Sequence, residues 1–217
     1  MYAIAHLFDL SHTRSASYLQ QFTYPWEALS GIQAHIIALG SALGEDFIEV
    51  SPQVWVHKTA KVAPTAYLGA PCIIGAETEV RHCAFIRGSA LVGDGCVVGN
   101  SVELKNVILF DKVQVPHYNY VGDSILGYKS HMGAGSVTSN VKSDGSLVVI
   151  HGSENIPTGR KKVGAMLGDF VEVGCNSVLN PGTVIGRHSN VYPLSCVRGV
   201  VPENSIYKTG GLIVAKK

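Results

Sequence analysis

Aliphatic residues recur at every sixth position along most of the chain. The first run contains nine in a row, namely Val56, Val62, Leu68, Ile74, Val80, Ile86, Val92, Val98 and Leu104. Phe110 and Pro116 continue the spacing, which shortens to five residues at Val121 and Leu126 and resumes at Met132. The second run consists of Leu167, Val173, Leu179, Ile185, Val191 and Val197.

A period of six fits neither a helix nor a strand that alternates residue by residue. It fits short strands joined by tight turns, three to a coil, with about 18 residues per coil and about 4.8 Å between coils. The fifth residue of each hexad is small, as a crowded corner requires; examples are Ala66, Cys72 and Thr78. The pattern predicts an all-β fold, a parallel β-helix of hexapeptide repeats with about six coils.

Three parts of the chain lie outside the repeat. We expect a short N-terminal helical segment over residues 1–50, the β-helix over 51–205 and a C-terminal tail over 206–217. Residues 139–166 break the repeat with a polar insertion, which on a solenoid is usually a functional loop or a disordered one.

One helix is predicted over residues 24–39 of the N-terminal segment. Pro25 suits its first turn and Gly40 its exit. Its apolar stripe, which must pack on the main body, consists of Trp26, Leu29, Ile32 and Ile36.

Composition narrows the class of protein. Of the 217 residues, 46% are apolar and 15% charged, so the chain can bury a core. Lys+Arg is 17 and Asp+Glu is 16, which gives no net field toward nucleic acid or an anionic membrane. We find no secretion signal, no apolar run of membrane-spanning length and no CxxC among the five cysteines. We therefore expect a cytoplasmic protein without nucleic-acid or membrane partners, whose reduced cysteines mostly fill space.

Two cations are placed by the repeat on one face. Arg87 and Lys105 each follow an inward-facing aliphatic residue and are 18 residues apart, so they stack one coil apart. A phosphate bridging them would relieve their repulsion, although two unrelated surface cations fit the spacing equally well. Glu103, close in sequence, offsets part of the charge. The basic run at 160–162 is either a solvated surface or a further anion site.

His117 is the candidate general base. By the hexad count it follows Pro116 and points outward on a different face from Arg87. Its surroundings, VPHYNYVGDS, are dense in polar and aromatic groups, and the repeat slips directly afterwards. Histidine is the natural proton acceptor near neutral pH.

Several motifs in order along residues 50–205 carry a family resemblance. PHYNYVGDS, GAGSVTSN and TGRKKVGAMLGD resemble the acetyltransferase domain of the bifunctional glucosamine-1-phosphate acetyltransferase/N-acetylglucosamine-1-phosphate uridyltransferase, and its archaeal-type sugar-1-phosphate branch more closely still. The resemblance implies left-handed coils and a homotrimer with active sites between subunits. It also implies transfer of an acetyl group from acetyl-CoA to the amine of an amino-sugar 1-phosphate, glucosamine 1-phosphate being favoured.

The resemblance also implies residue roles. His117 would deprotonate the attacking amine and Glu103 would orient or polarise it. The residues implied for the sugar phosphate are Arg87, Lys105, Tyr120, Asn140 and Lys162. His131 stands where bacterial members carry an Asn that contacts the amino sugar. The residues implied for the coenzyme are Ala134, Cys175 and Pro193, of which the last two depart from the family's small polar or Ala residues. No metal is implied.

Several alternatives stay open. The chain has no glycine-rich LxAGxGTR-like loop, so we expect no nucleotidyl transfer from it. A γ-class carbonic anhydrase needs three zinc-bound histidines; His82 and His117 are spaced suggestively, but the third position falls on Gly122. A non-catalytic solenoid that binds a sugar phosphate, or serves as a regulatory subunit of a nucleotidyltransferase, is the rival from another class. Galactosamine 1-phosphate is the alternative acceptor.

Overall fold

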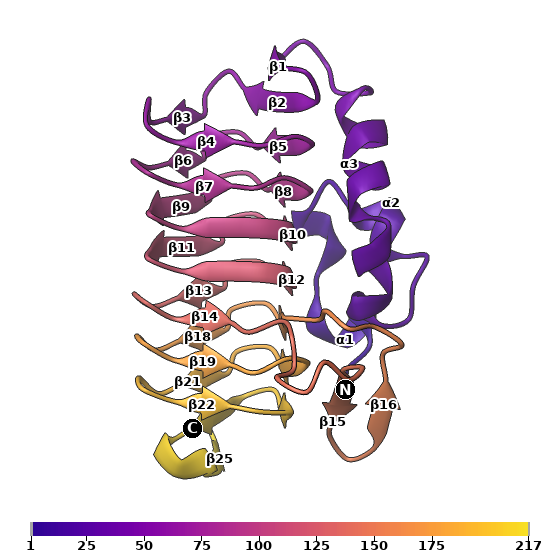
Figure 1. Ribbon diagram of the computed structural model, residues 1–217, viewed down its shortest axis with the longest axis vertical. Coiled ribbons are helices and arrows are strands. Elements are labelled where there is room, and N and C mark those ends of the chain that lie inside the picture. The colour runs from indigo at the N-terminus through magenta and orange to yellow at the C-terminus, as the bar shows by residue number, and fades with distance from the viewer. Residues whose placement is uncertain (1, 217) are drawn as a thin grey trace.

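Short strands stack in three columns along the long axis of the molecule, as the computed structural model of residues 2–216 shows (Figure 1). Within each column the strands of successive coils pair in parallel, apart from the capping strands at the two ends. This is the predicted left-handed parallel β-helix. Non-glycine residues at its corners adopt the left-handed conformation, among them Tyr118 (φ 51°) and Asp123 (φ 48°).

Each column of strands forms one face of the solenoid. The first face contains β2 (Val54–His57), β5 (Cys72–Ile74), β8 (Ala90–Val92), β17 (Ala165–Leu167), β20 (Thr183–Ile185) and β23 (Val200–Val201). The second face contains β3 (Lys61–Val62), β6 (Glu79–Val80), β9 (Val97–Asn100), β11 (Gln114–His117), β13 (His131–Met132), β18 (Glu172–Val173), β21 (Asn190–Val191) and β24 (Ser205–Tyr207). The third face contains β4 (Tyr67–Leu68), β7 (Phe85–Ile86), β14 (Val137–Thr138), β19 (Val178–Leu179) and β22 (Cys196–Val197).

Two long strands join the third face to the first. β10 (Glu103–Leu109) pairs with β7 through its first residues and with β8 through its last ones, and β12 (Tyr120–Leu126) continues below it. Across the described chain, the second face stacks eight parallel strands, so the predicted count of about six coils is too low. The hexad count missed coils whose spacing departs from six residues.

The coils vary in length, and this corrects the register inferred from the hexads. Val92 pairs with Leu109 and Val98 with Val115, so this coil has 17 residues instead of 18. The inward residues are therefore Leu109 and Val115, and neither Phe110 nor Pro116 occupies an inward position. A residue lost at a corner leaves an apolar neighbour in the expected place, which hides the slip.

Phe110 is buried outside the coil instead. It stands at the position that Gly93 and Gly127 occupy in adjacent coils, and its ring centroid lies 5.0 Å from that of Phe8. The N-terminal segment thus covers a side chain that the regular repeat would leave exposed.

The interior is filled as the pattern predicted. Aliphatic residues such as Ile74, Val92 and Leu104 are fully buried, and each contributes about 1.5–3 kcal/mol. Cys72 and Cys96 fill corners, where burial raises the pKa of each thiol to about 12. The other three cysteines are exposed, so the expectation that cysteines mostly fill space is wrong, although all five are free thiols.

The N-terminal segment packs along the first face as several short helices. These are α1 (Ile4–Leu7), the 3-10 turn η1 (Leu10–His12), α2 (Ala16–Leu19), the 3-10 helix η2 (Pro25–Ser30) and α3 (Ile32–Gly40). The predicted single helix is therefore split at Gly31, where a side chain would meet the Tyr18 hydroxyl at 2.5 Å. Its apolar stripe is buried as expected, with α3 against β5, β8 and β10, and η2 against β12.

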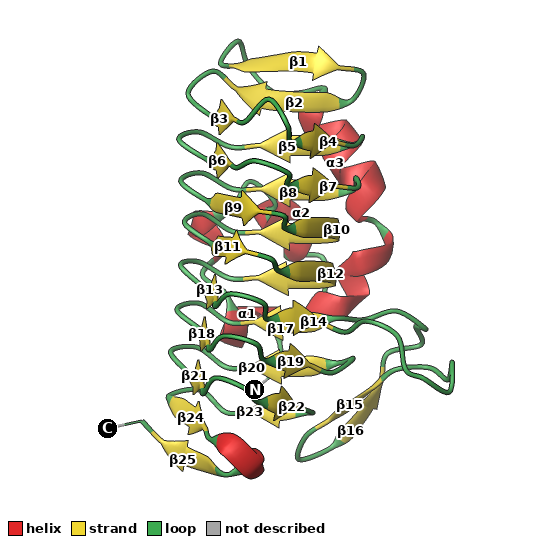
Figure 2. Cartoon of the chain, turned by 60° about the vertical axis from the view of Figure 1, so that its left-hand side comes forward, coloured by secondary structure: helices red, strands yellow, loops and turns green. Residues whose placement is uncertain are grey.

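Added elements close the ends of the solenoid and extend its side. β1 (Phe47–Ser51) pairs antiparallel with β2 at one end, and β25 (Ile213–Ala215), after the turn η3 (Thr209–Gly211), pairs antiparallel with β24 at the other. Such caps cover otherwise open sheet edges. The insertion carries an antiparallel hairpin, β15 (Val149–His151) and β16 (Asn155–Pro157), which projects from the coils (Figure 2).

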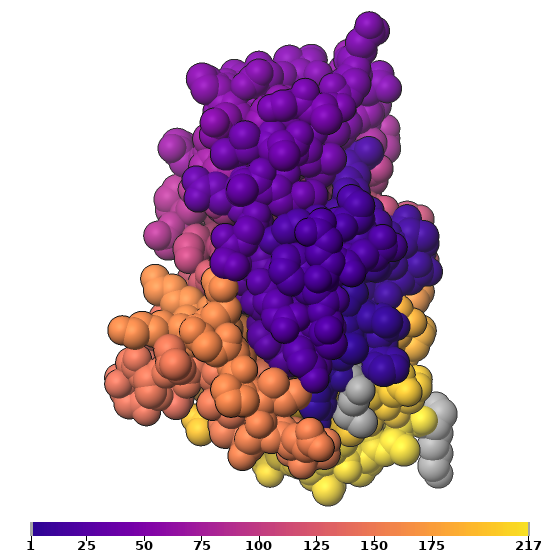
Figure 3. Space-filling model, turned by 90° about the vertical axis from the view of Figure 1, so that its right-hand side faces the viewer, coloured from indigo at the N-terminus to yellow at the C-terminus, as the bar shows by residue number. Residues whose placement is uncertain are grey.

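The insertion lies beside the N-terminal segment on the surface of the molecule (Figure 3). The Tyr2 hydroxyl lies 3.0 Å from the Ser153 hydroxyl and accepts a 2.8 Å hydrogen bond from the Ser153 amide. The two additions to the solenoid therefore contact each other and flank the same stretch of coils.

Candidate functional site

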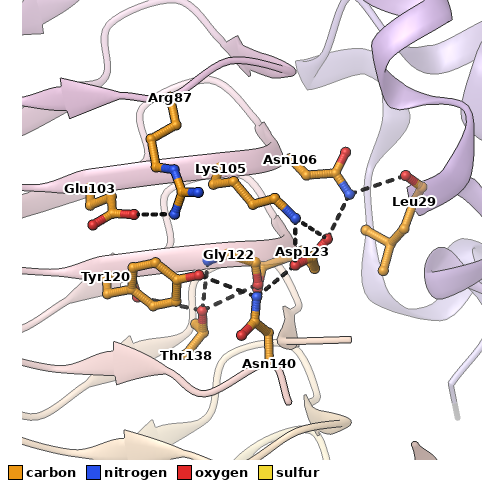
Figure 4. A network of polar contacts seen from close by, with 11 residues as sticks. Leu29, Arg87, Glu103, Lys105, Asn106, Tyr120, Gly122, Asp123, Thr138 and Asn140 are labelled. Carbon is orange, nitrogen blue, oxygen red and sulfur yellow. Dashed lines mark hydrogen bonds and ion pairs between the residues drawn. The ribbon is translucent and has the colours of Figure 1, made fainter. Parts of the chain in front are cut away.

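Arg87 and Lys105 lie one coil apart on the third face, as their spacing predicted. Ile86 pairs with Leu104, and the Arg87 amide donates to the Leu104 carbonyl at 2.9 Å. Each cation already has a carboxylate partner. Arg87 Nη1 lies 2.8 Å from Glu103 Oε1, and Lys105 Nζ lies 3.2 Å from Asp123 Oδ1 (Figure 4). The stack is thus neutralised within the chain, and the offset predicted for Glu103 is observed.

Asp123 is the centre of this network and was not singled out from the sequence. Its side chain is only 4% exposed, and it accepts from Lys105 Nζ, from Asn106 Nδ2 at 2.8 Å and from Asn140 Nδ2 at 2.6 Å. A buried carboxylate requires such partners. Asn106 Nδ2 also donates to the Leu29 carbonyl at 3.2 Å, which ties the network to the N-terminal segment.

Tyr120 and Asn140 extend the network along the third face. Asn140 Nδ2 lies 3.2 Å from the Tyr120 hydroxyl, and Tyr120 pairs with Glu103 of the coil above. Burial raises the pKa of the Tyr120 phenol, so its hydroxyl stays protonated and can donate at neutral pH. Gly122 provides the space, because a side chain there would meet the Tyr120 hydroxyl at 2.5 Å.

A cleft of about 760 Å³ opens beside these residues. The solenoid contributes Arg87, Lys105 and Asp123, and the N-terminal segment contributes Leu29, Ser30 and Gln33. The insertion contributes residues 159–162, which include the predicted site residue Lys162. The structure therefore gathers the implied phosphate-binding residues from three separate parts of the chain at or beside one cleft.

His117 lies at the end of β11 on the second face, with an exposed side chain. It pairs with Asn100, so it is the second residue after the inward Val115, and the position assigned from the hexad count is wrong. Within residues 2–216 its imidazole makes no hydrogen bond. The buried Asn119 holds the turn, because its Oδ1 accepts from the His117 amide at 3.2 Å and its Nδ2 donates to the Gly133 carbonyl at 2.9 Å.

The three residues implied for the coenzyme continue the line of His117 down one corner of the solenoid. The amide that follows each residue donates to the equivalent residue one coil above: Gly135 to the His117 carbonyl at 3.0 Å, Asn176 to Ala134 at 2.8 Å and Leu194 to Cys175 at 2.9 Å. The aligned corner residues are His117, Ala134, Cys175 and Pro193. All are at least partly accessible, so they line one continuous strip of surface.

His131 lies apart from this network. It belongs to β13 on the second face, opposite Gln114, and its Nδ1 is 2.8 Å from Glu172 Oε2. The register puts it across a corner from Tyr120 and Asn140, so a single chain does not bring the three together. Its contact with an amino sugar stays a prediction.

Metal-binding and membrane-spanning features were also considered. Within residues 2–216, no group of three or more His, Cys, Asp or Glu side chains is placed to hold a metal ion. His82 Nδ1 lies 2.9 Å from the Thr65 hydroxyl, so the carbonic-anhydrase alternative gains no support from one chain. No helix in the described chain is both long enough and apolar enough to cross a membrane.

Fold and site together define the class: a hexapeptide-repeat β-helix with a polar cluster and a basic cleft on one side. No protein-family model matches the chain. It is similar to the bifunctional protein GlmU of Methanococcus maripaludis, at 29% identity over 205 residues, which cover 92% of this chain and 50% of that protein. It is also similar to a bifunctional sugar-1-phosphate nucleotidylyltransferase/acetyltransferase of Sulfurisphaera tokodaii, at 28% identity, covering 76% of this chain and 41% of that one.

The predicted resemblance to GlmU-type proteins is thus confirmed, and the chain spans about half the length of these curated relatives or less. Among solved structures, a hexapeptide transferase family protein from Anaplasma phagocytophilum aligns with a TM-score of 0.42 and 14% identity. That alignment covers 73% of this chain and 76% of the other.

Proposed function

We propose that this chain is an N-acetyltransferase that acts as a homotrimer. It transfers acetyl from acetyl-CoA to the amine of an amino-sugar 1-phosphate, with glucosamine 1-phosphate as the favoured acceptor. The observation that carries the proposal is the ordered polar network of Arg87, Lys105, Asp123 and Asn140, which lies one corner away from the exposed His117.

The network supports binding of the acceptor's phosphate. Glu103 uses only one nitrogen of the Arg87 guanidinium, which has five N–H donors in all, so Arg87 can also bind a phosphate. Asp123 holds the Lys105 ammonium in place, and Lys162 adds a cation from the opposite wall of the cleft. Tyr120 and Asn140 supply the hydrogen-bonding groups for the sugar.

His117 supplies the proton chemistry. The acceptor amine must lose a proton before it is a nucleophile, and the imidazole accepts that proton as the nitrogen attacks the thioester carbonyl carbon. The new C–N bond gives a tetrahedral oxyanion, whose collapse breaks the C–S bond and expels the CoA thiolate, which then takes up a proton. The Ala134 amide makes no backbone hydrogen bond within residues 2–216 and is our candidate donor to the oxyanion.

The corner strip supports a place for the coenzyme. From His117 through Ala134 and Cys175 to Pro193 there are three coil steps, or about 14 Å at the strand spacing. An extended pantetheine arm can follow this line parallel to the solenoid axis. A neighbouring subunit placed against the strip would enclose it, and this is why the proposal includes a trimer.

Release of free thiol from acetyl-CoA tests the proposal directly. Wild type and His117→Ala are assayed with glucosamine 1-phosphate and, in parallel, galactosamine 1-phosphate. We expect sugar-dependent release that the substitution abolishes while the oligomer persists in solution scattering. Binding of the sugar phosphate without release from either acceptor would instead establish the regulatory solenoid, an alternative that the internal pairing of Arg87 and Lys105 also allows.

A further inference from the structure

The cleft continues past the residues assigned to the acceptor's phosphate. Its far side is formed by Ser30 and Gln33 of the N-terminal segment and by residues 159–162 of the insertion, which we call the basic arm. Its volume of about 760 Å³ lies in the upper part of the range of about 300–1,000 Å³ in which pockets hold whole small-molecule ligands. There is therefore room for a group attached to the phosphate of the sugar.

The charge of the cleft also exceeds what one phosphate needs. Its cations are Arg87, Lys105, Arg160, Lys161 and Lys162. The first two are paired with carboxylates, whereas none of the three in the basic arm forms an ion pair with any residue from 2 to 216. The far side of the cleft therefore carries uncompensated positive charge, which favours a second anionic group.

The basic arm is held in place by its backbone. The Val148 amide donates to the Arg160 carbonyl at 2.8 Å, and the Val163 amide donates to the Asn140 carbonyl at 3.0 Å. The arm thus begins on the insertion and ends beside the polar network. Arg160 Nε is buried and has no hydrogen-bond partner in the described chain, a state that is costly unless a ligand satisfies it.

We propose that the basic arm is a second phosphate subsite, so that the cleft takes a sugar with a diphosphate on its anomeric carbon, as in a nucleotide sugar. This inference rests on the proposed function, because the first phosphate is the one bound by Arg87 and Lys105. The second phosphate then lies on Arg160, whose planar fork suits it, and on Lys161. A nucleotide sugar with a free amine is an acceptor, and its N-acetylated counterpart is a competing ligand.

Calorimetry on the intact protein tests the subsite with three ligands: N-acetylglucosamine 1-phosphate, UDP-N-acetylglucosamine and UDP. We expect the diphosphate sugar to bind about tenfold tighter than the monophosphate, as one or two charged hydrogen bonds would provide. Substituting Arg160→Gln and Lys161→Ala together should bring that ratio close to one. Lys142→Ala is the matched control, because Lys142 belongs to the same insertion but lines a different cavity, and it should leave the ratio unchanged.

Thiol release with UDP-glucosamine separates the two roles. Release shows that the diphosphate sugar is an acceptor, and competitive inhibition by UDP-N-acetylglucosamine without such release shows that it is an inhibitor; either supports the subsite. Equal affinity for the two acetylated sugars, UDP alone binding as tightly as the UDP-sugar, or a ratio unchanged in the double variant would overturn it. Failure of the proposed function appears elsewhere, as no thiol release from glucosamine 1-phosphate, while the calorimetric ratio remains measurable.

Discussion

Asp123→Asn removes one negative charge from the centre of the polar network and keeps the shape of the side chain. Three donors converge on this carboxylate: Lys105, Asn106 and Asn140. The new amide nitrogen would face at least one of them donor to donor. Lys105 would also lose its only carboxylate partner in the described chain.

The cost follows from the burial of the two partners. Breaking a fully buried ion pair costs about 3–5 kcal/mol, and one charged hydrogen bond contributes about 1.5–3 kcal/mol. The Asp123 side chain is 4% exposed but that of Lys105 is 29% exposed, so water replaces part of the loss. We therefore expect about 2–4 kcal/mol of destabilisation, or a Tm lower by about 5–15 °C in a chain of this size.

The same substitution should raise the KM for glucosamine 1-phosphate about tenfold to a hundredfold, because Lys105 and Asn140 lose their orientation. Thermal unfolding and steady-state kinetics measure the two effects. Asp169→Asn is the matched control: Asp169 is equally buried, is paired with Arg187 at 3.1 Å, and lies at a different corner of the solenoid. If both variants lose similar stability and neither changes KM, the network is structural only and our reasoning is refuted.

Three further predictions use other parts of the chain. His117→Ala should lower kcat by about 10²–10⁴-fold with KM little changed, as loss of a general base does, and stopped-flow thiol detection measures it. Lys105→Ala should destabilise the fold more than Arg87→Ala, since only Lys105 leaves a buried carboxylate unpaired, and calorimetric unfolding compares them. Burial raises the pKa of Cys72 and Cys96 from 9.0 to about 12, so a thiol reagent at pH 8 should titrate three of the five cysteines in the native protein and all five in denaturant. For the same reason stability should fall as pH rises from 9 toward 12, where only the unfolded chain can ionise these thiols.

The sequence was sufficient for the architecture because one aliphatic residue per hexad must point inward in every coil. The same spacing placed Arg87 and Lys105 on one face, since stacking depends only on the number of residues in a coil. It failed at the coil of 17 residues, where Phe110 stood in for Leu109 and His117 was assigned to the wrong position. An apolar neighbour at a corner makes such a slip invisible to a hexad count.

The site needed the tertiary structure because its parts come from distant segments. Asp123 looks like an ordinary corner residue in the sequence, and its importance arises from donors that arrive from the coil above and from the insertion. The far wall of the cleft depends on Leu29, which the fold brings to Asn106 across 77 residues of sequence.

By itself, then, the sequence determined the solenoid, the direction of its side chains and the identity of most polar residues that meet at the cleft. Periodicity is a local property, and each coil repeats the geometry of the one before. Only the tertiary structure decided which cations keep a carboxylate partner and which three remain free, and where the insertion and the N-terminal segment close the cleft. Those contacts join non-repeating segments, whose docking depends on packing and charge and not on spacing along the chain.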